Sequence, residues 1–244
     1  MLGKFIVFEG ADGSGTTTQS KELVQALQQK FGEKSAIWTA EPSQGVIGKT
    51  LRSILSGEHG GLDSVWGWRE MSYLFMADRI HHVKTEILPA LQAGVHVVCD
   101  RYYASTLVYQ SVGDYSTQGD YPGTRRMVSL YEEVTKADKF LEPDLWLYLQ
   151  VSDARYLKNR MSSRSSLEIY EEDVLQQKVV ELYDTWYSLH RLHVLPTRSL
   201  LSPIYKINGL WDKGRIAEQC MARMTKEFFQ QKEGSHGECS ARND

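Results

Sequence analysis

The sequence has few cysteines, no long apolar run and no excess of positive charge. Its three cysteines include no CxxC pair, so their spacing favours neither a disulfide framework nor a zinc site. No apolar run reaches the roughly 18 residues that cross a bilayer, and no signal peptide opens the chain. A net charge of −3 disfavours a nucleic-acid polymer as a partner. We therefore expect a cytoplasmic protein that binds neither a membrane nor a nucleic acid.

A lysine is missing from an otherwise recognisable motif near the N-terminus. Residues 10–17 match the phosphate-binding pattern G-x-x-x-x-G-K-[ST] at every fixed position except the lysine, where Thr16 stands. The motif lies between an apolar strand predicted at 4–9 and a helix predicted at 15–31. Small residues in such a turn let backbone N–H groups point inward, which still predicts an anion-binding loop. Thr17 is then expected to coordinate Mg²⁺.

Apolar strands alternate with helical segments along the rest of the chain. Further strands are predicted at 35–40, 95–99, 144–150 and 203–207. Further helices are predicted at 45–56, 65–93, 102–137 with a Gly-rich interruption near 113–123, 153–162, 168–191 and 212–230. Wholly apolar strands and this alternation are typical of a doubly wound, parallel α/β sheet with helices on both faces. We expect one domain over residues 1–229 and a polar, disordered tail over 230–244.

Three polar clusters follow predicted strands directly. They are the phosphate-binding loop, Glu41-Pro42 and Asp100-Arg101. In open α/β sheets, ligands bind outside the carboxyl ends of the strands. The sequence therefore predicts one ligand site at this edge. The adjacent His81 and His82 show no metal-ligand pattern and are expected at the surface or at an edge.

The ordered segments resemble those of thymidylate kinases, which make dTDP from dTMP and ATP. The matching segments are the loop, Glu41-Pro42, Phe75-Met-Ala-Asp-Arg79, Asp100 to Gln110 and Pro143-Asp144-Leu145, within a similarity from about residue 4 to 220. The resemblance implies a three-layer P-loop kinase fold with a five-stranded parallel sheet and a small lid at about 158–168. It also implies ATP as co-substrate, Mg²⁺ as cofactor, dTMP as acceptor and a homodimer.

The resemblance assigns a role to individual residues. For ATP binding it implies Gly10, Ala11, Asp12, Gly13, Ser14, Gly15, Thr16, Thr17 and Thr18, with Thr17 on the metal. For dTMP binding it implies Glu41, Arg52, Phe75, Arg79, Arg101, Ser105, Tyr109 and Gln110. The catalytic residues that it implies are Asp12, Arg101, Arg160 and Arg164.

Several of these residues also have a purely structural interpretation. Phe75 could stack on thymine or belong to the core. Arg101 could grip the acceptor phosphate or only pair with Asp100, and Asp12 could contact the sugar or only form a turn. Likewise, Glu41 could merely end its strand. The arginines of the lid could close over the phosphates or cap a helix.

The missing lysine has a large expected cost. Removing one cation about 4 Å from a phosphate, at an effective dielectric of about 20, forfeits roughly 4 kcal/mol. That corresponds to about a thousandfold in rate. Either another basic residue replaces the lysine, with Lys49, Arg52, Arg160 and Arg164 as candidates, or the protein is a weakly catalytic, regulatory nucleotide binder. A kinase for dUMP or a 5-modified dUMP is a further alternative, and Ala40 stands where the family usually has an arginine.

Overall fold

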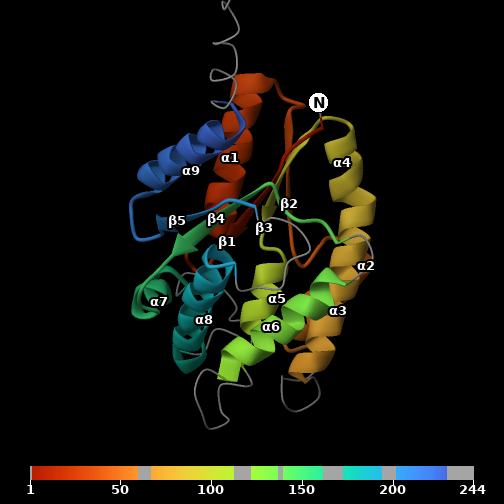
Figure 1. The fold of residues 1–244 in the computed structure, drawn as a ribbon, viewed down its shortest axis with the longest axis vertical. Helices are drawn as coiled ribbons and strands as arrows, with labels where there is room; N and C mark the ends of the chain where they lie inside the picture. Colours follow the sequence, from red (N-terminus) through yellow and green to blue (C-terminus); the bar gives the residue numbers. More distant parts are fainter. Residues whose placement is uncertain are drawn as a thin grey trace, which may run out of the picture.

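Five parallel strands form the centre of the protein (Figure 1). The computed structural model describes residues 2–59, 67–112, 122–136, 140–161, 173–193 and 202–229. The strands are β1 (Phe5–Glu9), β2 (Ala36–Ala40), β3 (His96–Asp100), β4 (Leu145–Gln150) and β5 (Ile204–Asn208). Their order across the sheet is β2-β3-β1-β4-β5, and every neighbouring pair is parallel. The predicted five-stranded parallel sheet is confirmed.

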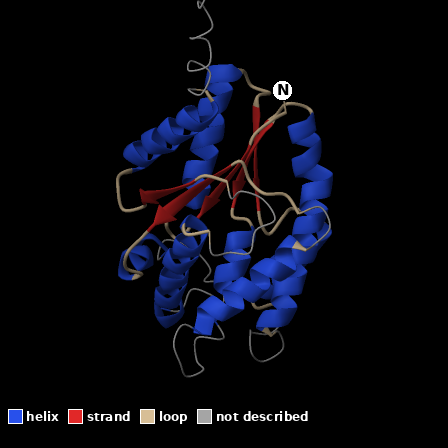
Figure 2. Cartoon of the chain, in the orientation of Figure 1, coloured by secondary structure: helices blue, strands red, loops and turns tan. Residues whose placement is uncertain are grey.

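Helices cover both faces of this sheet (Figure 2). The elements are α1 (Thr16–Phe31), α2 (Val46–Leu55), α3 (Trp68–His82), a π-helical turn η1 (Val83–Ile87), α4 (Leu88–Gln92), α5 (Tyr103–Tyr109), α6 (Pro122–Thr135), α7 (Arg155–Met161), α8 (Asp173–Arg191) and α9 (Lys213–Phe228). Side chains of β1 alternate between two cores. Ile6 and Phe8 pack with residues of α1 and α9, while Phe5 and Val7 pack with those of the other helices. This alternation confirms the three-layer α/β architecture.

The predicted helix at 65–93 differs in one respect from the structure. The described part runs from α3 through η1 into α4, so its i→i+4 hydrogen bonding is interrupted at Val83–Ile87. Pro89 explains the change, because its ring nitrogen carries no hydrogen and its ring crowds the carbonyl four residues earlier. None of the described helices combines the length and apolarity that a membrane crossing requires.

The carboxyl ends of all five strands lie at the same edge of the sheet. Segments that leave this edge include the loop after β1, Glu41 after β2 and Arg101 after β3. The backbone joins them directly, because Glu41 N donates to Asp100 O at 3.1 Å and Arg101 N donates to Phe8 O at 2.9 Å. The predicted convergence of the three polar clusters is therefore confirmed. Of the predicted lid, residues 162–168 lie outside the described residues.

Leu147→Ala should destabilise the fold because Leu147 is fully buried in β4 beneath α1 and α9. We expect a loss of about 2–5 kcal/mol in the free energy of unfolding, measured by urea denaturation. Leu192→Ala is the matched control, since Leu192 is 72% exposed, and should change stability by less than about 0.5 kcal/mol. Equal effects of the two substitutions would contradict the assignment of Leu147 to the core.

Candidate active site

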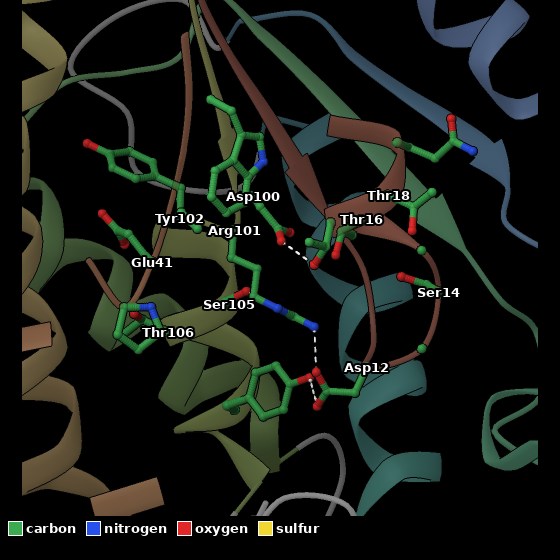
Figure 3. Close-up of a pocket in the computed structure, with 18 of the residues that line it drawn as sticks. Asp12, Ser14, Thr16, Thr18, Glu41, Asp100, Arg101, Tyr102, Ser105 and Thr106 are labelled. Atoms are coloured by element: carbon green, nitrogen blue, oxygen red, sulfur yellow. Dashed lines mark hydrogen bonds and ion pairs between the residues drawn. The ribbon is translucent and has the colours of Figure 1, made fainter. Parts of the chain in front are cut away.

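A cavity of about 620 Å³ opens at the carboxyl edge of the sheet (Figure 3). The predicted site residues that line it are Asp12, Gly13, Ser14, Gly15, Thr16, Thr17, Thr18, Glu41, Arg52, Phe75, Arg79, Arg101, Ser105, Tyr109, Gln110 and Arg160. Gly10 and Ala11 belong to the loop but are not among the residues that line the cavity. Arg164 lies outside the described residues. The structure thus gathers most predicted ATP-binding and dTMP-binding residues around one space.

The loop between β1 and α1 is tightly closed. Ser14 N donates to Ala11 O at 3.0 Å, which turns the chain back on itself. A side chain at Gly10 would meet Leu149 O at 2.7 Å, so only glycine fits against β4. Gly15 has a φ of 100° immediately before α1, a left-handed conformation that favours glycine. This geometry presents the positive N-terminal end of α1 to the cavity, as an anion site requires.

The side chains of Thr17 and Asp100 bring a hydroxyl and a carboxylate together beside the loop. The Thr17 hydroxyl donates to Asp100 Oδ2 at 2.5 Å (Figure 3). Asp100 ends β3 and is 6% exposed, and its Oδ1 is buried with no hydrogen-bond partner among the described residues. A hydroxyl and a carboxylate with an unsatisfied oxygen suit a hard cation such as Mg²⁺. The sequence analysis did not name Asp100 as a candidate metal ligand. The available signal was an acidic residue that ends an apolar strand beside the loop.

Arg101 joins the loop to the helices opposite. Its Nη2 donates to Asp12 Oδ1 at 2.7 Å, and its Nη1 donates to Gly10 O at 2.8 Å. The same Nη1 also donates to Tyr183 OH at 3.0 Å and Ser105 Oγ at 3.2 Å. The ion pair of Arg101 is therefore with Asp12, and not with Asp100 as the structural interpretation of the sequence had it. The Arg101 backbone has a φ of 70°, an uncommon value for this residue type that often marks a functional position.

Asp12 is more than a turn former. Besides Arg101, its carboxylate accepts a hydrogen bond from Tyr109 OH at 2.7 Å and one from Gln176 Nε2 at 3.3 Å. Figure 3 shows the Asp12 and Arg101 side chains directed toward one another across the cavity. Gln176, which the sequence did not single out, reaches this carboxylate from α8. Three elements therefore orient the Asp12 side chain, so its position is suited to contact a ligand.

A buried ion pair lies at the opposite end of the cavity. Arg79 Nη2 lies 2.7 Å from Glu41 Oε2, and both side chains are at most 5% exposed. Arg79 also donates to Thr106 Oγ1 at 2.8 Å, and its guanidinium lies 5.1 Å from the centre of the Tyr102 ring. Glu41 therefore faces the site rather than merely ending β2. Removing both charges from water costs desolvation energy, so a buried ion pair is weak evidence of a stabilising role.

The remaining predicted dTMP-binding residues surround this ion pair. Arg52 of α2 donates to the Pro42 carbonyl. Phe75 is half-buried, lines the cavity and packs against the core, a position that is compatible with either interpretation considered from the sequence. Gln110 is 1% exposed, so its side chain is directed into the protein and not into solvent. The prediction that His82 lies at the surface or at an edge is wrong. The residue is 1% exposed, and its Nε2 lies 2.7 Å from Thr39 Oγ1.

Glu9 is a buried carboxylate that sequence reasoning missed. Its Oε1 accepts from the backbone N–H of Tyr102 at 2.8 Å and of Ser105 at 3.1 Å. Its Oε2 accepts from Ser105 Oγ at 2.7 Å and Tyr183 OH at 2.9 Å. Burial raises the pKa of Glu9 to about 7, although the charge of Arg101 opposes this shift. Because Ser105 and Tyr183 also contact Arg101, Glu9 orients the groups that hold the guanidinium.

These features together define a class of protein. A parallel sheet of order β2-β3-β1-β4-β5, an anion-binding loop after β1 and a hydroxyl–carboxylate pair for Mg²⁺ are the parts of a P-loop phosphotransferase. The cavity continues from the loop to a second, arginine-containing end, which leaves room for an acceptor beside the nucleotide. The fold and the site therefore define a P-loop kinase of small molecules.

Comparison with known proteins identifies the family. The sequence model described as thymidylate kinase matches residues 8–201. A probable thymidylate kinase of Methanococcus aeolicus is 37% identical over 182 residues, which are 75% of this chain and 78% of the relative. A thymidylate kinase of Ligilactobacillus salivarius is 34% identical over 184 residues, which are 75% and 80% of the two chains. The chain belongs to the thymidylate kinase family, and it is a nucleoside monophosphate kinase, which confirms the resemblance seen in its motifs.

Glu9→Gln should change how stability depends on pH. A glutamate has a pKa near 4.5 when unfolded, against about 7 for Glu9 in the fold, so between these values the folded protein holds the extra proton. The free energy of unfolding therefore falls as pH rises through this window, by at most about 1.4 kcal/mol per pH unit from this group. Without the carboxyl group, the fall should be shallower when urea denaturation is followed from pH 5 to 8.

Glu33→Gln is the matched control for this measurement. Glu33 is exposed just after α1, so its replacement should leave the pH dependence of the wild type unchanged. A Glu9→Gln variant with the same pH dependence as the Glu33→Gln variant would show that Glu9 is not the titrating group.

Proposed function

We propose that this protein transfers the γ-phosphoryl group of ATP to dTMP and releases ADP and dTDP. The observation that carries the proposal is the position of Arg101 in the cavity. Its guanidinium lies between the phosphate-binding loop, where it contacts Gly10 O and Asp12, and the end that holds Arg79 and Phe75. One cavity thus offers a donor end and an acceptor end with an arginine at their junction. The activity of the thymidylate kinase family fits this arrangement.

The donor end holds the phosphates of ATP mainly through the backbone. Amides from Gly13 to Thr17 and the N-terminus of α1 face the phosphates, because the loop is closed by the bond from Ser14 N to Ala11 O. Thr17 and Asp100 are the residues that would hold Mg²⁺. When bound, Mg²⁺ neutralises negative charge on the β- and γ-phosphates. The hydrogen bonds of Asp12 to Arg101 and Tyr109 fix the position of the loop relative to Arg101.

The acceptor end positions dTMP for in-line attack. Arg101 is suited to bind the acceptor phosphate in a bidentate manner, exchanging its bond to Asp12 for one to the phosphate. Phe75 supplies a ring for stacking on the thymine, while Arg79 and Gln110 offer N–H donors from buried positions. The attacking oxygen is already ionised, so no strong general base is needed. Catalysis consists of alignment and charge neutralisation.

The two alternatives considered from the sequence are not favoured. Family membership supports dTMP over dUMP or a 5-modified dUMP as acceptor, and an enzyme over a regulatory nucleotide binder. A coupled assay of ADP release with ATP, Mg²⁺ and a panel of deoxynucleoside monophosphates tests both. The highest kcat/KM should be obtained with dTMP. ATP binding without any ADP release would favour the regulatory alternative.

Other features predicted from the sequence remain proposals. These are the homodimer, the cytoplasmic location, the single domain over 1–229, the tail over 230–244, the lid at about 158–168 and the catalytic role of Arg164. The resemblance to the family supports the dimer and the lid. For the dimer, analytical ultracentrifugation at micromolar concentration is the direct measurement.

Arg101→Ala should abolish dTMP phosphorylation and leave ATP binding nearly intact. The substitution removes the donors at the junction of the cavity, while the backbone amides of the loop remain. We expect kcat/KM for dTMP to fall by about a thousandfold or more, which corresponds to the loss of one close cation–phosphate contact. ATP affinity, measured by calorimetry, should change less than about threefold. The control is Arg125→Ala on the exposed face of α6, and loss of ATP binding in Arg101→Ala would contradict the assignment.

Asp100→Asn should raise the Mg²⁺ concentration that the reaction requires. The amide keeps the size of the side chain but removes the negative charge that lies beside Thr17. The concentration of free Mg²⁺ at half-maximal activity should rise about tenfold or more, with the order of preference among acceptors unchanged. Asp144→Asn, at the opposite edge of the sheet where Asp144 pairs with Lys4, is the control. An unchanged Mg²⁺ requirement in Asp100→Asn would remove Asp100 from the metal site.

A further inference from the structure

Polar side chains of α3 contact every second residue at the end of β2 and just beyond it. The contacts join Thr39 to His82, Glu41 to Arg79 and Ser43 to Asp78. All three of the side chains from α3 are buried. Alternate residues of a strand share a face, which explains why Thr39 and Glu41 are both turned toward α3. The end of β2 is therefore fixed to this helix by side chains at several points.

Glu41 lies between two basic side chains, and each of its oxygens has its own partner. Arg79 Nη2 lies 2.7 Å from Glu41 Oε2, and Arg79 Nε donates to the same oxygen at 2.9 Å. On the other side, His82 Nδ1 lies 3.4 Å from Glu41 Oε1. Because the two partners hold different oxygens, the carboxylate cannot rotate without losing one of them. His82 therefore limits the positions that Glu41 can take beneath Arg79.

The contacts of Arg79 leave one of its nitrogens for a ligand. Its Nε is bound to Glu41, and its Nη2 is shared between Glu41 and Thr106 Oγ1. Its Nη1 is buried and has no hydrogen-bond partner among the described residues, although Arg79 lines the cavity. A buried donor without an acceptor is costly, so this nitrogen is suited to an acceptor atom of a bound molecule. Whatever fixes Glu41 also fixes the direction of this donor.

Acidic groups from three segments surround His82. They are Glu41 after β2, Asp78 of α3 and Glu86 of η1, whose Oε2 lies 3.6 Å from His82 Nε2. Arg79 is the neighbouring cation, on the far side of Glu41. Burial lowers the pKa of His82, but the hydrogen bond and charge of Glu41, with the charges of Glu86 and Asp78, outweigh it and raise the pKa. The imidazole therefore keeps its proton to a higher pH than an exposed histidine does.

We infer that His82 is a positioning residue for the acceptor, and that it acts through Glu41 on Arg79. The inference rests on the proposed function, since it takes dTMP as the ligand of Arg79. His82 fixes one oxygen of Glu41, the other oxygen fixes Nε and Nη2 of Arg79, and Nη1 then faces the acceptor. A charge-assisted hydrogen bond is roughly twice as strong as a neutral one, so Glu41 is held most firmly when His82 is protonated. Binding of dTMP therefore weakens as pH rises through the pKa of His82.

Two substitutions separate the two contacts of His82. The amide nitrogen of His82→Asn takes the place of Nδ1 beside Glu41, whereas that of His82→Gln takes the place of Nε2 beside Thr39. His82→Gln should raise KM for dTMP by about tenfold or more and change kcat by less than about threefold, because a hydrogen bond to a charged group is lost. His82→Asn should keep KM within about threefold of the wild type at pH 7. The reverse order, or equal effects, would show that His82 does not act through Glu41.

The pH dependence of KM is a readout that a packing role would not change. In the wild type, KM for dTMP should rise by about threefold or more between about pH 6.5 and pH 9, as His82 loses its charge. This rise should be at least halved in both variants, whose amides do not titrate. The second ionisation of the dTMP phosphate is common to all the proteins compared. His81→Gln, at the exposed neighbouring residue, is the matched control and should keep the wild-type profile. An undiminished rise in both His82 variants would overturn the inference.

A titration without substrate separates this inference from the proposed function. In the NMR spectrum of the nucleotide-free wild type, the Arg79 Nε–H signal should shift with pH at the same midpoint as the ring protons of His82. This measurement on the wild type holds even if a variant fails to fold. If the protein phosphorylates no monophosphate, the proposed function fails, while the titration still decides whether His82 acts on Arg79. If dTMP is phosphorylated but the Arg79 signal does not follow His82, the role of His82 alone is overturned.

Discussion

The site depends on how one guanidinium is held at the edge of a parallel sheet. Arg101 follows β3 directly and is bonded to the loop after β1 through Gly10 and Asp12, and to α8 through Tyr183. Because Arg101 and these partners come from three separate parts of the chain, the guanidinium reaches this position only when all three are assembled. In the proposed mechanism Arg101 exchanges its bond to Asp12 for bonds to the acceptor phosphate, since a phosphate is a better bidentate partner than a single carboxylate oxygen. Preorganisation and exchange are what an acceptor-binding arginine requires.

A second layer of polar groups supports this arrangement. Glu9 accepts four hydrogen bonds without any exposure to solvent, and two of its partners, Ser105 and Tyr183, also contact Arg101. Such a network is stable only when its members are satisfied, so it orders the N-terminus of α5 against β1. The raised pKa of Glu9 means that this order is obtained at a cost in stability near neutral pH. Glu9 thus lowers stability near neutral pH at a position where its side chain orients the groups that contact Arg101.

The sequence predicted the sheet well because strand signals are local. Apolar runs ended by glycine or acid placed all five strands to within one residue at most ends, and their shared direction placed the polar clusters at one edge. Side-chain pairings were harder to predict from the sequence, since they depend on how segments far apart in the chain are placed next to one another. The pairing of Arg101 with Asp12, the burial of His82 against Thr39 and the role of Glu9 all join residues far apart in the chain. The π-helical turn before Pro89 was missed because proline weakens a helix without always ending it.

Positive charge is unevenly distributed between the two ends of the cavity. At the acceptor end each described arginine of the cavity already faces an oxygen of the protein, so an entering monophosphate competes with Asp12 for Arg101. At the donor end the backbone contributes only the helix terminus, equivalent to about half a positive charge. A triphosphate with Mg²⁺ still carries net negative charge, so a loop without lysine leaves it under-neutralised. Thr16 lines the cavity and adds no charge to this end, so the loop itself supplies only the helix terminus and its backbone amides.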